Sequence, residues 1–561
     1  MAGTVPRDLA PPRAWVIVMI VATLVGVWLR LDQIGRQVLI DDEWHAVHQF
    51  LTHTPREMFV EFGYADYSIP LGILDWYQAQ WWGVSELTLR WPMLACGLAT
   101  LVLFPLYIAP RLGRATAALF AVLIAMSPLL VVFTRMARPY AITLLLGWIA
   151  HAAYQRYHAA SRGEVATGAV YAVAAALATW LHPVVGPFVA APLLWGLVAL
   201  RHVSRANRRV AFLRWLLLAF ATGALTAAVV MPPLLAHPLS LAAKGGAQGP
   251  GLDTLVGVWY AWLGTPSTGV VLLSVALAAF GAPRVWRALP VARSGALGLA
   301  LTLALVMATG VMWSHLPVTM GRYLLPIVPL LLVCVATGTV RVAEFIARPA
   351  TPLRRGLAIA SLALPVLFLA AKSPLVPLMR FPNGQTQHLI SYIDFRRDHN
   401  PYVPQFAAIP LSPFWKTLAT QPAGSLRIAA APFYFESYGW DAPRWERLSR
   451  QSVVPGYLTE LCVDFRPGEL PSSARFRFAN SVHLADPADL KAKRIDLVVW
   501  QKPYQLIVAG HSDSIGADTA ACEGVLRGKF GTPAYEDSHI IVFDLARPAN
   551  PQPSSTSDAP R

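Results

Sequence analysis

The run AWVIVMIVATLVGVWL, residues 14–29, decides the fold class of this chain. It carries no charged residue and is long enough for a tilted helix to cross a bilayer. Arg7 and Arg13 precede it, and no small-residue cleavage site leads from it into a soluble domain. The run is therefore interpreted as an uncleaved first membrane span.

The composition extends this interpretation to most of the chain. Hydrophobic residues make up 55% of the 561 residues, charged residues only 14%, and the mean hydropathy is +0.47. Soluble proteins usually carry about 25% charged residues. Ten further apolar runs are expected to span, at 91–109, 115–133, 139–154, 166–181, 184–200, 211–232, 267–282, 294–313, 323–343 and 356–372. The predicted fold is a polytopic α-helical membrane protein of about eleven spans.

The net charge of +15 lies on one face of this topology. Residues 373–561 carry 19 Lys/Arg and 18 Asp/Glu, whereas the segments between spans on the N-terminal side hold 18 basic residues against three acidic ones. The positive-inside rule predicts this distribution of charge, so the N-terminus is expected on the cytoplasmic side of a bacterial inner membrane. The excess therefore requires no nucleic-acid partner.

The predicted division of the chain is a membrane module over 1–372 and an extracytoplasmic domain after it. Within the module, 30–90 and 233–266 are the long outer segments, and residues 71–82 (LGILDWYQAQWW) are expected to form an interfacial helix among the lipid headgroups. Residues 373–547 alternate short β-type runs with helix-like stretches and are predicted to be a soluble α/β domain. The β-type runs are 426–432, 495–500 and 539–545, and a helix is expected at 444–451.

Two features of the C-terminal region stay open. Cys462 and Cys522 are expected either to form a disulfide, if the region is extracytoplasmic, or to remain free. The Pro/Ser-rich tail 548–561 is predicted to be disordered.

Ten residues after the first span the chain reads LIDDEWHAVH, residues 39–48. Asp41, Asp42 and Glu43 are consecutive, and Asp66 and Asp75 follow in the same outer segment. Carboxylates beside a bilayer face water or a polar cavity. They can bind a metal, accept a proton or simply decorate a solvated loop.

Three arginines lie on the outer face, against the positive-inside bias: Arg135, Arg138 and Arg322. A guanidinium matches phosphate with bidentate hydrogen bonds, and a lipid-linked phosphate is the anion expected there. The alternative is that these arginines pair with the outer carboxylates or anchor helix ends. A carboxylate opposite phosphate-binding arginines suits an inverting glycosyl transfer: the base takes a proton from the acceptor, and arginine stabilises the leaving phosphate.

Several short motifs follow one another in a recognisable order. After Asp42-Glu43 come 66–71 (DYSIPL), 85–92 (SELTLRWP), Ser127-Pro128 and 138–141 (RPYA). Later come 180–182 (WLH), 321–324 (GRYL) followed by Pro326 and Pro329, and 382–388 (PNGQTQH). In this order they resemble the motifs of the integral-membrane GT-C glycosyltransferases, relatives of protein O-mannosyltransferases and of lipid A aminoarabinose transferase (family 39-like).

This resemblance implies transfer of a sugar from a polyprenyl-phosphate donor at the extracytoplasmic face. It implies that Asp42 is the general base, supported by Glu43 and Asp41, and that Asp66 is a second carboxylate. The consecutive triplet leaves the register of the family's Asp-Glu pair ambiguous by one residue.

The resemblance further implies that Arg138 and Arg322 hold the donor phosphate, with Tyr140, Tyr323 and His182 near the site. The charge sorting adds Arg135 to the substrate-binding candidates. The sugar and the acceptor, which is a lipid, a polysaccharide or a protein, stay open because pocket shape sets them.

Other function classes fit less of the sequence. His45 and His48 beside the triplet would suit a divalent metal, although ordinary hydrogen-bonding histidines are the commoner case; no cofactor is otherwise indicated. A lipid-linked sugar flippase or transporter is one alternative, but no internal repeat is visible. A membrane-anchored glycan-binding scaffold is another, but it would leave the outer arginines unexplained.

Overall fold

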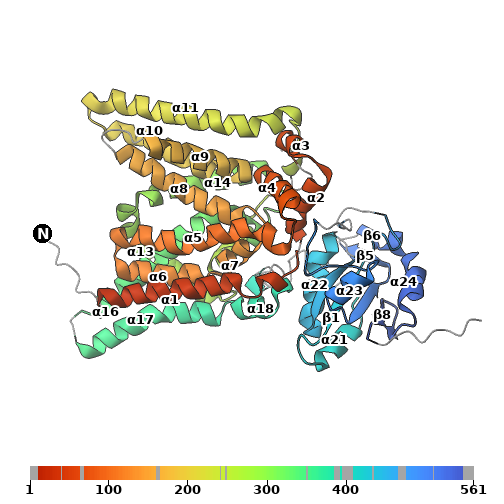
Figure 1. Cartoon of the computed structure of the whole chain (residues 1–561). Helices are drawn as coiled ribbons and strands as arrows, with labels where there is room; N and C mark the ends of the chain where they lie inside the picture. The colour runs from red at the N-terminus through yellow and green to blue at the C-terminus, as the bar shows by residue number, and fades with distance from the viewer. Residues whose placement is uncertain are drawn as a thin grey trace, which may run out of the picture.

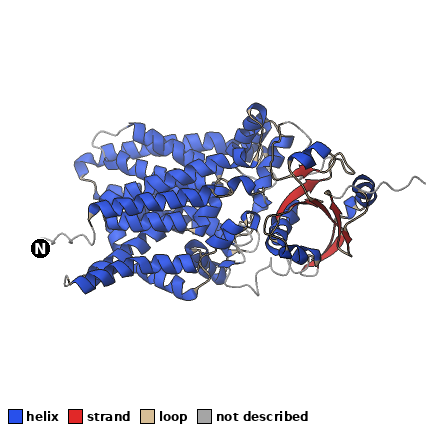
Figure 2. Cartoon of the chain, turned by 60° about the horizontal axis from the view of Figure 1, so that its bottom comes forward, coloured by secondary structure: helices blue, strands red, loops and turns tan. Residues whose placement is uncertain are grey.

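A computed structural model of the chain consists of a long helical bundle with a sheet-containing part at one end (Figure 1). The structure describes residues 11–39, 41–62, 68–159, 165–240, 242–246, 249–348, 351–384, 389, 392–393, 409–432, 435–464, 470, 475–508 and 511–546. Asp66, residues 385–388 of the last motif and the tail 548–561 lie outside these ranges. Figure 2 shows every drawn strand at one end of the bundle.

The bundle is built from helices at the positions of the predicted spans. They are α1 (Pro12–Leu31), α5 (Glu86–Leu112), α6 (Arg114–Met126), α7 (Pro128–Arg135), α8 (Tyr140–Ala159), α9 (Val165–Leu181), α10 (Gly186–Ala199), α11 (Arg205–Ala236), α13 (Thr268–Ala288), α14 (Pro290–Thr309), α16 (Val328–Ile346) and α17 (Pro352–Ala371). A multi-pass helical membrane protein is therefore confirmed.

The number of spans is a separate matter. Within the described ranges, eight helices are long and apolar enough to cross a membrane, or nine if the bent pair α6–α7 counts as one. The helix α9 has only 17 residues. The predicted count of about eleven is therefore not established.

The third predicted span, 115–133, is not one straight helix. It breaks between α6 and α7 with a bend of 56°. Pro128 has no N–H to continue the helix, and Ser127 caps the new one by accepting a hydrogen bond from the amide of Leu130. The bend brings Arg135, at the end of α7, toward α1.

Close helix crossings hold the bundle together where small residues meet. At the α13–α16 crossing, a Cβ on Gly281 would lie 2.1 Å from the carbonyl oxygen of Cys334, and one on Gly338 would lie 1.9 Å from that of Leu277. Only glycine permits this approach, as is common between membrane helices.

Short helices cover the end of the bundle that faces the sheet. Figure 1 labels three of them there, α2 (Trp44–Thr52), α3 (Pro55–Val60) and α4 (Ile69–Trp81). The turns η1 (Ile34–Arg36) and η2 (Asp41–Glu43) precede these in the chain, and α15 (Pro317–Tyr323), which is joined to η2 by the Arg322–Asp42 ion pair, packs against α12 (Leu252–Leu263). The helix α4 matches the expected interfacial segment 71–82, and Trp81 and Trp82 at its end are 66% and 62% exposed. Exposed indole rings there suit a headgroup contact, which stays a prediction.

The C-terminal part is an α/β fold. Its main sheet has the order β3-β2-β1-β4-β8-β7, in which β1 pairs in parallel with β2 and β4, and β8 pairs antiparallel with β4. The strands are β1 (Arg427–Ala431), β2 (Ser452–Tyr457), β3 (Val482–His483), β4 (Leu497–Gln501), β7 (Tyr535–Glu536) and β8 (Ile540–Asp544). The helices α22 (Phe435–Ser449), α23 (Pro487–Ala492) and α24 (Cys522–Phe530) alternate with them, and β5 (Tyr504–Val508) pairs with β6 (His511–Ile515). The three predicted strands are confirmed. The predicted helix 444–451 is part of α22, which begins nine residues earlier and ends at Ser449.

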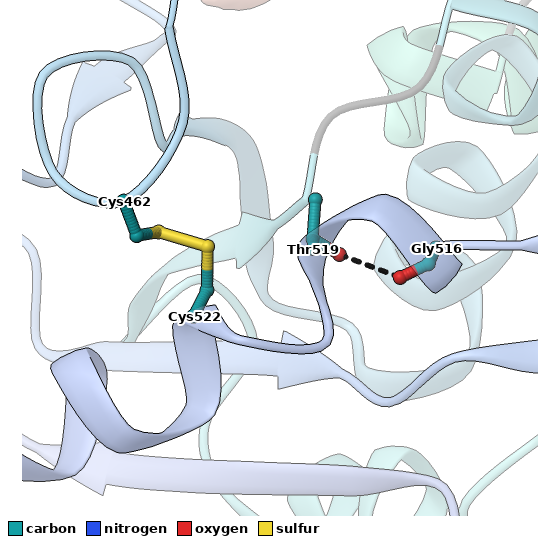
Figure 3. Close-up of a disulfide and its surroundings, with 4 residues drawn as sticks. All are labelled: Cys462, Gly516, Thr519 and Cys522. Atoms are coloured by element: carbon teal, nitrogen blue, oxygen red, sulfur yellow. Dashed lines mark hydrogen bonds between the residues drawn. A yellow bond between two sulfur atoms is a disulfide. The ribbon is translucent and has the colours of Figure 1, made fainter.

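Cys462 and Cys522 form a disulfide with a Cα–Cα distance of 5.3 Å (Figure 3). It ties the segment after β2 to the start of α24, across a sequence separation of 60. Of the two outcomes open at the sequence level, the structure has the bridge.

The α/β part shares a hydrophobic core with the segment between α1 and α5. Trp44 of α2 packs edge-on against Tyr457 and beside Phe478, with ring centroids 6.3 Å and 6.0 Å apart. Val84 also forms a bridge with Phe476, so strand-like pairing crosses between the two parts. The acidic triplet therefore lies at the junction of the helical bundle and the α/β fold.

Candidate active site

Asp42 lies in a charged cluster at this junction. Its Oδ2 accepts a hydrogen bond of 2.5 Å from Nη1 of Arg322, which comes from α15, 280 residues away in sequence. Its Oδ1 lies 3.5 Å from Nε2 of His45, one helical turn further along the chain. Both members of the Asp42–Arg322 pair keep some solvent contact, with side chains 15% and 16% exposed.

The charges around Asp42 set its ionisation. Burial alone would raise the pKa of the carboxyl, but the guanidinium of Arg322, helped by His45 and Arg138, holds that pKa well below its usual range. Asp42 is therefore an anion at neutral pH, as a proton acceptor must be.

Arg138 approaches the same residue from the turn between α7 and α8. Its Nη1 donates a hydrogen bond of 3.4 Å to the backbone carbonyl of Asp42, and its side chain is buried. Two of the three arginines predicted to lie against the positive-inside bias therefore contact Asp42.

Aromatic rings form one side of the cluster. The guanidinium carbon of Arg322 lies 5.5 Å from the ring centroid of Tyr140 and 5.6 Å from that of Tyr323. The ring of His182 lies 5.5 Å from each of these two tyrosines. Four elements far apart in sequence therefore bring Asp42, Arg138, Tyr140, His182, Arg322 and Tyr323 into one cluster.

Glu43 has a different environment from its neighbour. Its side chain and that of Arg90 have no exposed surface, and Arg90 binds it through two hydrogen bonds of 2.8 and 2.7 Å. The amide of Ala137 donates a third hydrogen bond of 2.8 Å to the same carboxylate. These contacts favour a positioning role for Glu43 over direct participation in chemistry.

Arg135 has a different environment from Arg138 and Arg322, the other two arginines predicted to bind the substrate. It is fully buried, and its Nη1 donates hydrogen bonds to the carbonyls of Leu29 (3.1 Å) and Asp32 (2.6 Å) at the end of α1. This matches the alternative in which an outer arginine anchors a helix end.

Two further candidates are incompletely described. Asp41 belongs to η2, but only its backbone is described. Asp66 lies outside the described residues. Arg90, in the motif 85–92, received no role from the sequence, because its partner Glu43 lies 47 residues away and no local pattern indicates the pairing.

The two histidines beside the triplet do not share one environment. His45 faces Asp42, whereas His48 lies beside Trp44, where burial and the nearby charge of His45 lower its pKa to about 4. Among the residues that the structure describes, no three His, Cys, Asp or Glu side chains are grouped as a metal site requires.

Comparisons with known proteins give structural likeness only. No protein-family model matches the chain. No curated protein matches it either. Among solved structures, the apo form of ArnT from Cupriavidus metallidurans is similar, with 13% identity and a TM-score of 0.42 over 96% of this chain and 99% of that one. The same protein bound to undecaprenyl phosphate has 12% identity and a TM-score of 0.42 over the same shares of the two chains. The apo Archaeoglobus fulgidus oligosaccharyltransferase has 12% identity and a TM-score of 0.41 over 87% of this chain and 69% of that one.

The first of these proteins is a lipid A aminoarabinose transferase, one of the relatives to which the motifs point. At these identities and TM-scores the likeness carries no argument about the reaction or the residues of this chain. The likeness to the ArnT structures extends over nearly the whole length of this chain.

Proposed function

We propose that this protein transfers a sugar from a polyprenyl-phosphate donor to an acceptor at the extracytoplasmic face, with inversion and with Asp42 as general base. The observation that carries the proposal is the cluster itself. The ionised carboxylate of Asp42 pairs with Arg322, and Arg138 donates to the backbone carbonyl of the same residue. Both arginines lie on the face predicted to be the outer one, where the positive-inside rule disfavours them.

The two arginines have the chemistry of a phosphate site. Guanidinium groups bind phosphate oxygens with charge-assisted, bidentate hydrogen bonds, and they stabilise the charge that grows on a leaving phosphate.

The Asp42–Arg322 ion pair explains how the base would become active. A carboxylate with a strongly lowered pKa is a weak base. When the donor phosphate takes hydrogen bonds from Arg322, the carboxylate loses part of that stabilisation, and its pKa rises. Donor binding would in this way prepare Asp42 for its step.

The proposed step balances without a covalent enzyme intermediate. The acceptor oxygen or nitrogen attacks the anomeric carbon, and its proton passes to Asp42. The bond between that carbon and the phosphate oxygen breaks, and the polyprenyl phosphate leaves with the electron pair beside Arg138 and Arg322. A single displacement of this kind inverts the anomeric configuration.

Two observations support an extracytoplasmic site in an inner membrane. The basic loops are expected on the side of the membrane opposite the acidic cluster, as the positive-inside rule predicts for cytoplasmic loops. The α/β part also contains a disulfide, and disulfides persist in oxidising compartments outside the cytoplasm. A periplasm-dependent reporter fused after Lys372 should be active, and an inactive reporter would reverse the orientation.

The test uses the full chain in lipid nanodiscs and a panel of undecaprenyl-phosphate monosaccharides. Release of undecaprenyl phosphate is measured, because transfer and slow hydrolysis both produce it. Wild type should release it from at least one donor, and Asp42→Asn should not. Asp253→Asn, which changes an exposed carboxylate on α12, is the matched control and should behave as wild type.

The opposite results are equally clear. Equal release by wild type and Asp42→Asn would remove Asp42 from its role. Movement of donor across the bilayer of sealed proteoliposomes, without release, would identify a transporter, and binding of glycans without either would identify a scaffold.

A further inference from the structure

The backbone that leads into the acidic triplet is held from both sides. The amide of Val38 donates a hydrogen bond of 2.7 Å to Oδ1 of Asn383, and the carbonyl of Val38 accepts one of 2.7 Å from Nη2 of Arg90. Val38 is fully buried and lies four residues before Asp42. Its position therefore helps to decide where Asp42 lies.

Asn383 belongs to η7 (Pro382–Gly384), the 3-10 turn that follows the short helix α18 (Leu375–Arg380) and packs against α22. Its Nδ2 donates to Oε1 of Glu446 (3.0 Å) and to the carbonyl of Val453 (3.2 Å), and its backbone amide donates to Oε2 of Glu446 (3.1 Å). Asn383 and Glu446 are both buried. The side-chain amide is thus an acceptor toward the bundle and a donor toward the α/β fold.

This arrangement requires an amide at position 383. An aspartate could still accept from Val38, but it has no N–H to give either Glu446 or the carbonyl of Val453. The two facing carboxyl groups would have to share the one proton that the raised pKa of Glu446 keeps there, and the Val453 carbonyl would lose its donor. Exchanging both groups, with Asp at 383 and Gln at 446, would restore a donor between them.

The hydrogen bonds continue from Val38 to the site. Arg90, which holds the Val38 carbonyl, also holds the carboxylate of Glu43 through two bonds, and Glu43 is the direct neighbour of Asp42. The helix α22, which carries Glu446, packs against η2, which carries Asp42. A continuous set of buried contacts therefore joins the α/β fold to the candidate base.

We infer that Asn383 and Glu446 are positioning residues that let the α/β part hold Asp42 in its reactive place through Val38, Arg90 and Glu43. The inference rests on the proposed function for its activity readout. It gives the α/β part a role in the reaction itself, in addition to any choice of acceptor.

The closing experiment compares four forms of the full chain in nanodiscs: wild type, Asn383→Asp, the double variant Asn383→Asp/Glu446→Gln, and Asn480→Asp. The last is the matched control. The Nδ2 of Asn480 donates a hydrogen bond of 2.7 Å to the carbonyl of Gly35 across the same junction, so its exchange removes a docking contact without touching Val38.

Three quantities are measured for each form: release of undecaprenyl phosphate from the sugar donor, the Kd for undecaprenyl phosphate, and amide hydrogen exchange of the peptide covering 37–48. Asn383→Asp should release about tenfold more slowly, because small misplacements of a catalytic group cost that much or more. Its Kd should stay within about twofold, since Arg138 and Arg322 come from other elements. The 37–48 peptide should exchange faster.

The double variant should recover release to within about threefold of wild type, and Asn480→Asp should stay within about twofold. Unchanged exchange and release in Asn383→Asp would overturn the inference. So would an equal loss of release and of phosphate binding, which would indicate general disruption, or a double variant no better than the single one. A wild type without release would count against the proposed function alone, because the exchange measurement tests positioning independently.

Discussion

Two neighbouring carboxylates, Asp42 and Glu43, each pair with an arginine from another part of the chain, but the two pairs differ in almost every other respect. The Glu43–Arg90 pair has no exposed surface, and Arg90 also donates to the carbonyls of Gln37 and Val38. The Asp42–Arg322 pair keeps solvent contact and is surrounded by Arg138, aromatic rings and His45. Adjacent residues of one motif can therefore have different roles: Glu43 is suited to fix the local backbone, whereas Asp42 is suited to accept a proton.

The largest difference expected between the pairs is in stability. Arg90→Met should lower the free energy of unfolding by about 3–5 kcal/mol, because it leaves Glu43 buried without its partner. Arg322→Met should cost less, about 1–3 kcal/mol, because Asp42 keeps some solvent contact and the neighbouring charges of Arg138 and His45. Thermal unfolding in detergent measures both, and equal losses would erase the distinction.

A smaller effect should separate the arginines by function. Arg322→Lys and Arg138→Lys keep the charge but lose the fork that binds phosphate, so the KM for the lipid donor should rise about tenfold for each. Arg135→Lys is the control, because Arg135 binds backbone carbonyls of α1 and should leave this KM unchanged. A similar rise for all three would return Arg135 to the substrate site.

Glu446 extends the comparison to a buried carboxylate whose main partner is an amide. Burial raises its pKa to about 8, against opposing effects of Asn383 and the charge of Arg36. The described charged and titratable groups that act on Glu446 or lie on elements packed against α22 are Arg36, Lys416, Tyr457, Asp42 and Glu43.

The sign of the pH effect follows from this shift. The folded state holds the Glu446 proton up to about pH 8, whereas an ordinary glutamate releases it near 4.5, so stability should fall as pH rises between these values. Glu446→Gln should flatten that part of the melting-temperature profile. Glu523→Gln, at an exposed ion pair on α24, is the control and should keep the wild-type slope.

The sequence was informative wherever the physics is local or follows charge sorting. Apolar runs predict the helices, β-type runs predict β1, β4 and β8, and the positive-inside bias indicates Arg138 and Arg322 as unusual. The bend at Pro128 and the span count depend on packing and on helix lengths that hydropathy alone does not resolve.

Long-range pairing was not predictable in the same way. Nothing in the residues near Glu43 indicates that Arg90 will hydrogen-bond to its carboxylate. Likewise, nothing near Val38 indicates that its amide will donate a hydrogen bond to Asn383, which is 345 positions away. The sequence therefore could not distinguish the role of Glu43 from that of Asp42, or the role of Arg135 from that of Arg322. Burial and hydrogen-bond partners in the structure distinguish them. Residue type predicts which chemistry is available, whereas burial decides which residue can use it.

The assignment of Asp42 as the general base is tested most directly by comparing Asp41→Asn with Asp42→Asn, because the sequence alone does not decide which of these two aspartates is the base. Release of undecaprenyl phosphate from a sugar donor by the full chain is measured for both. Asp42→Asn should lose about a hundredfold or more, in line with the loss of a general base, while Asp41→Asn keeps most of the wild-type rate. The reverse pattern, with activity lost in Asp41→Asn and kept in Asp42→Asn, would contradict the assignment of Asp42.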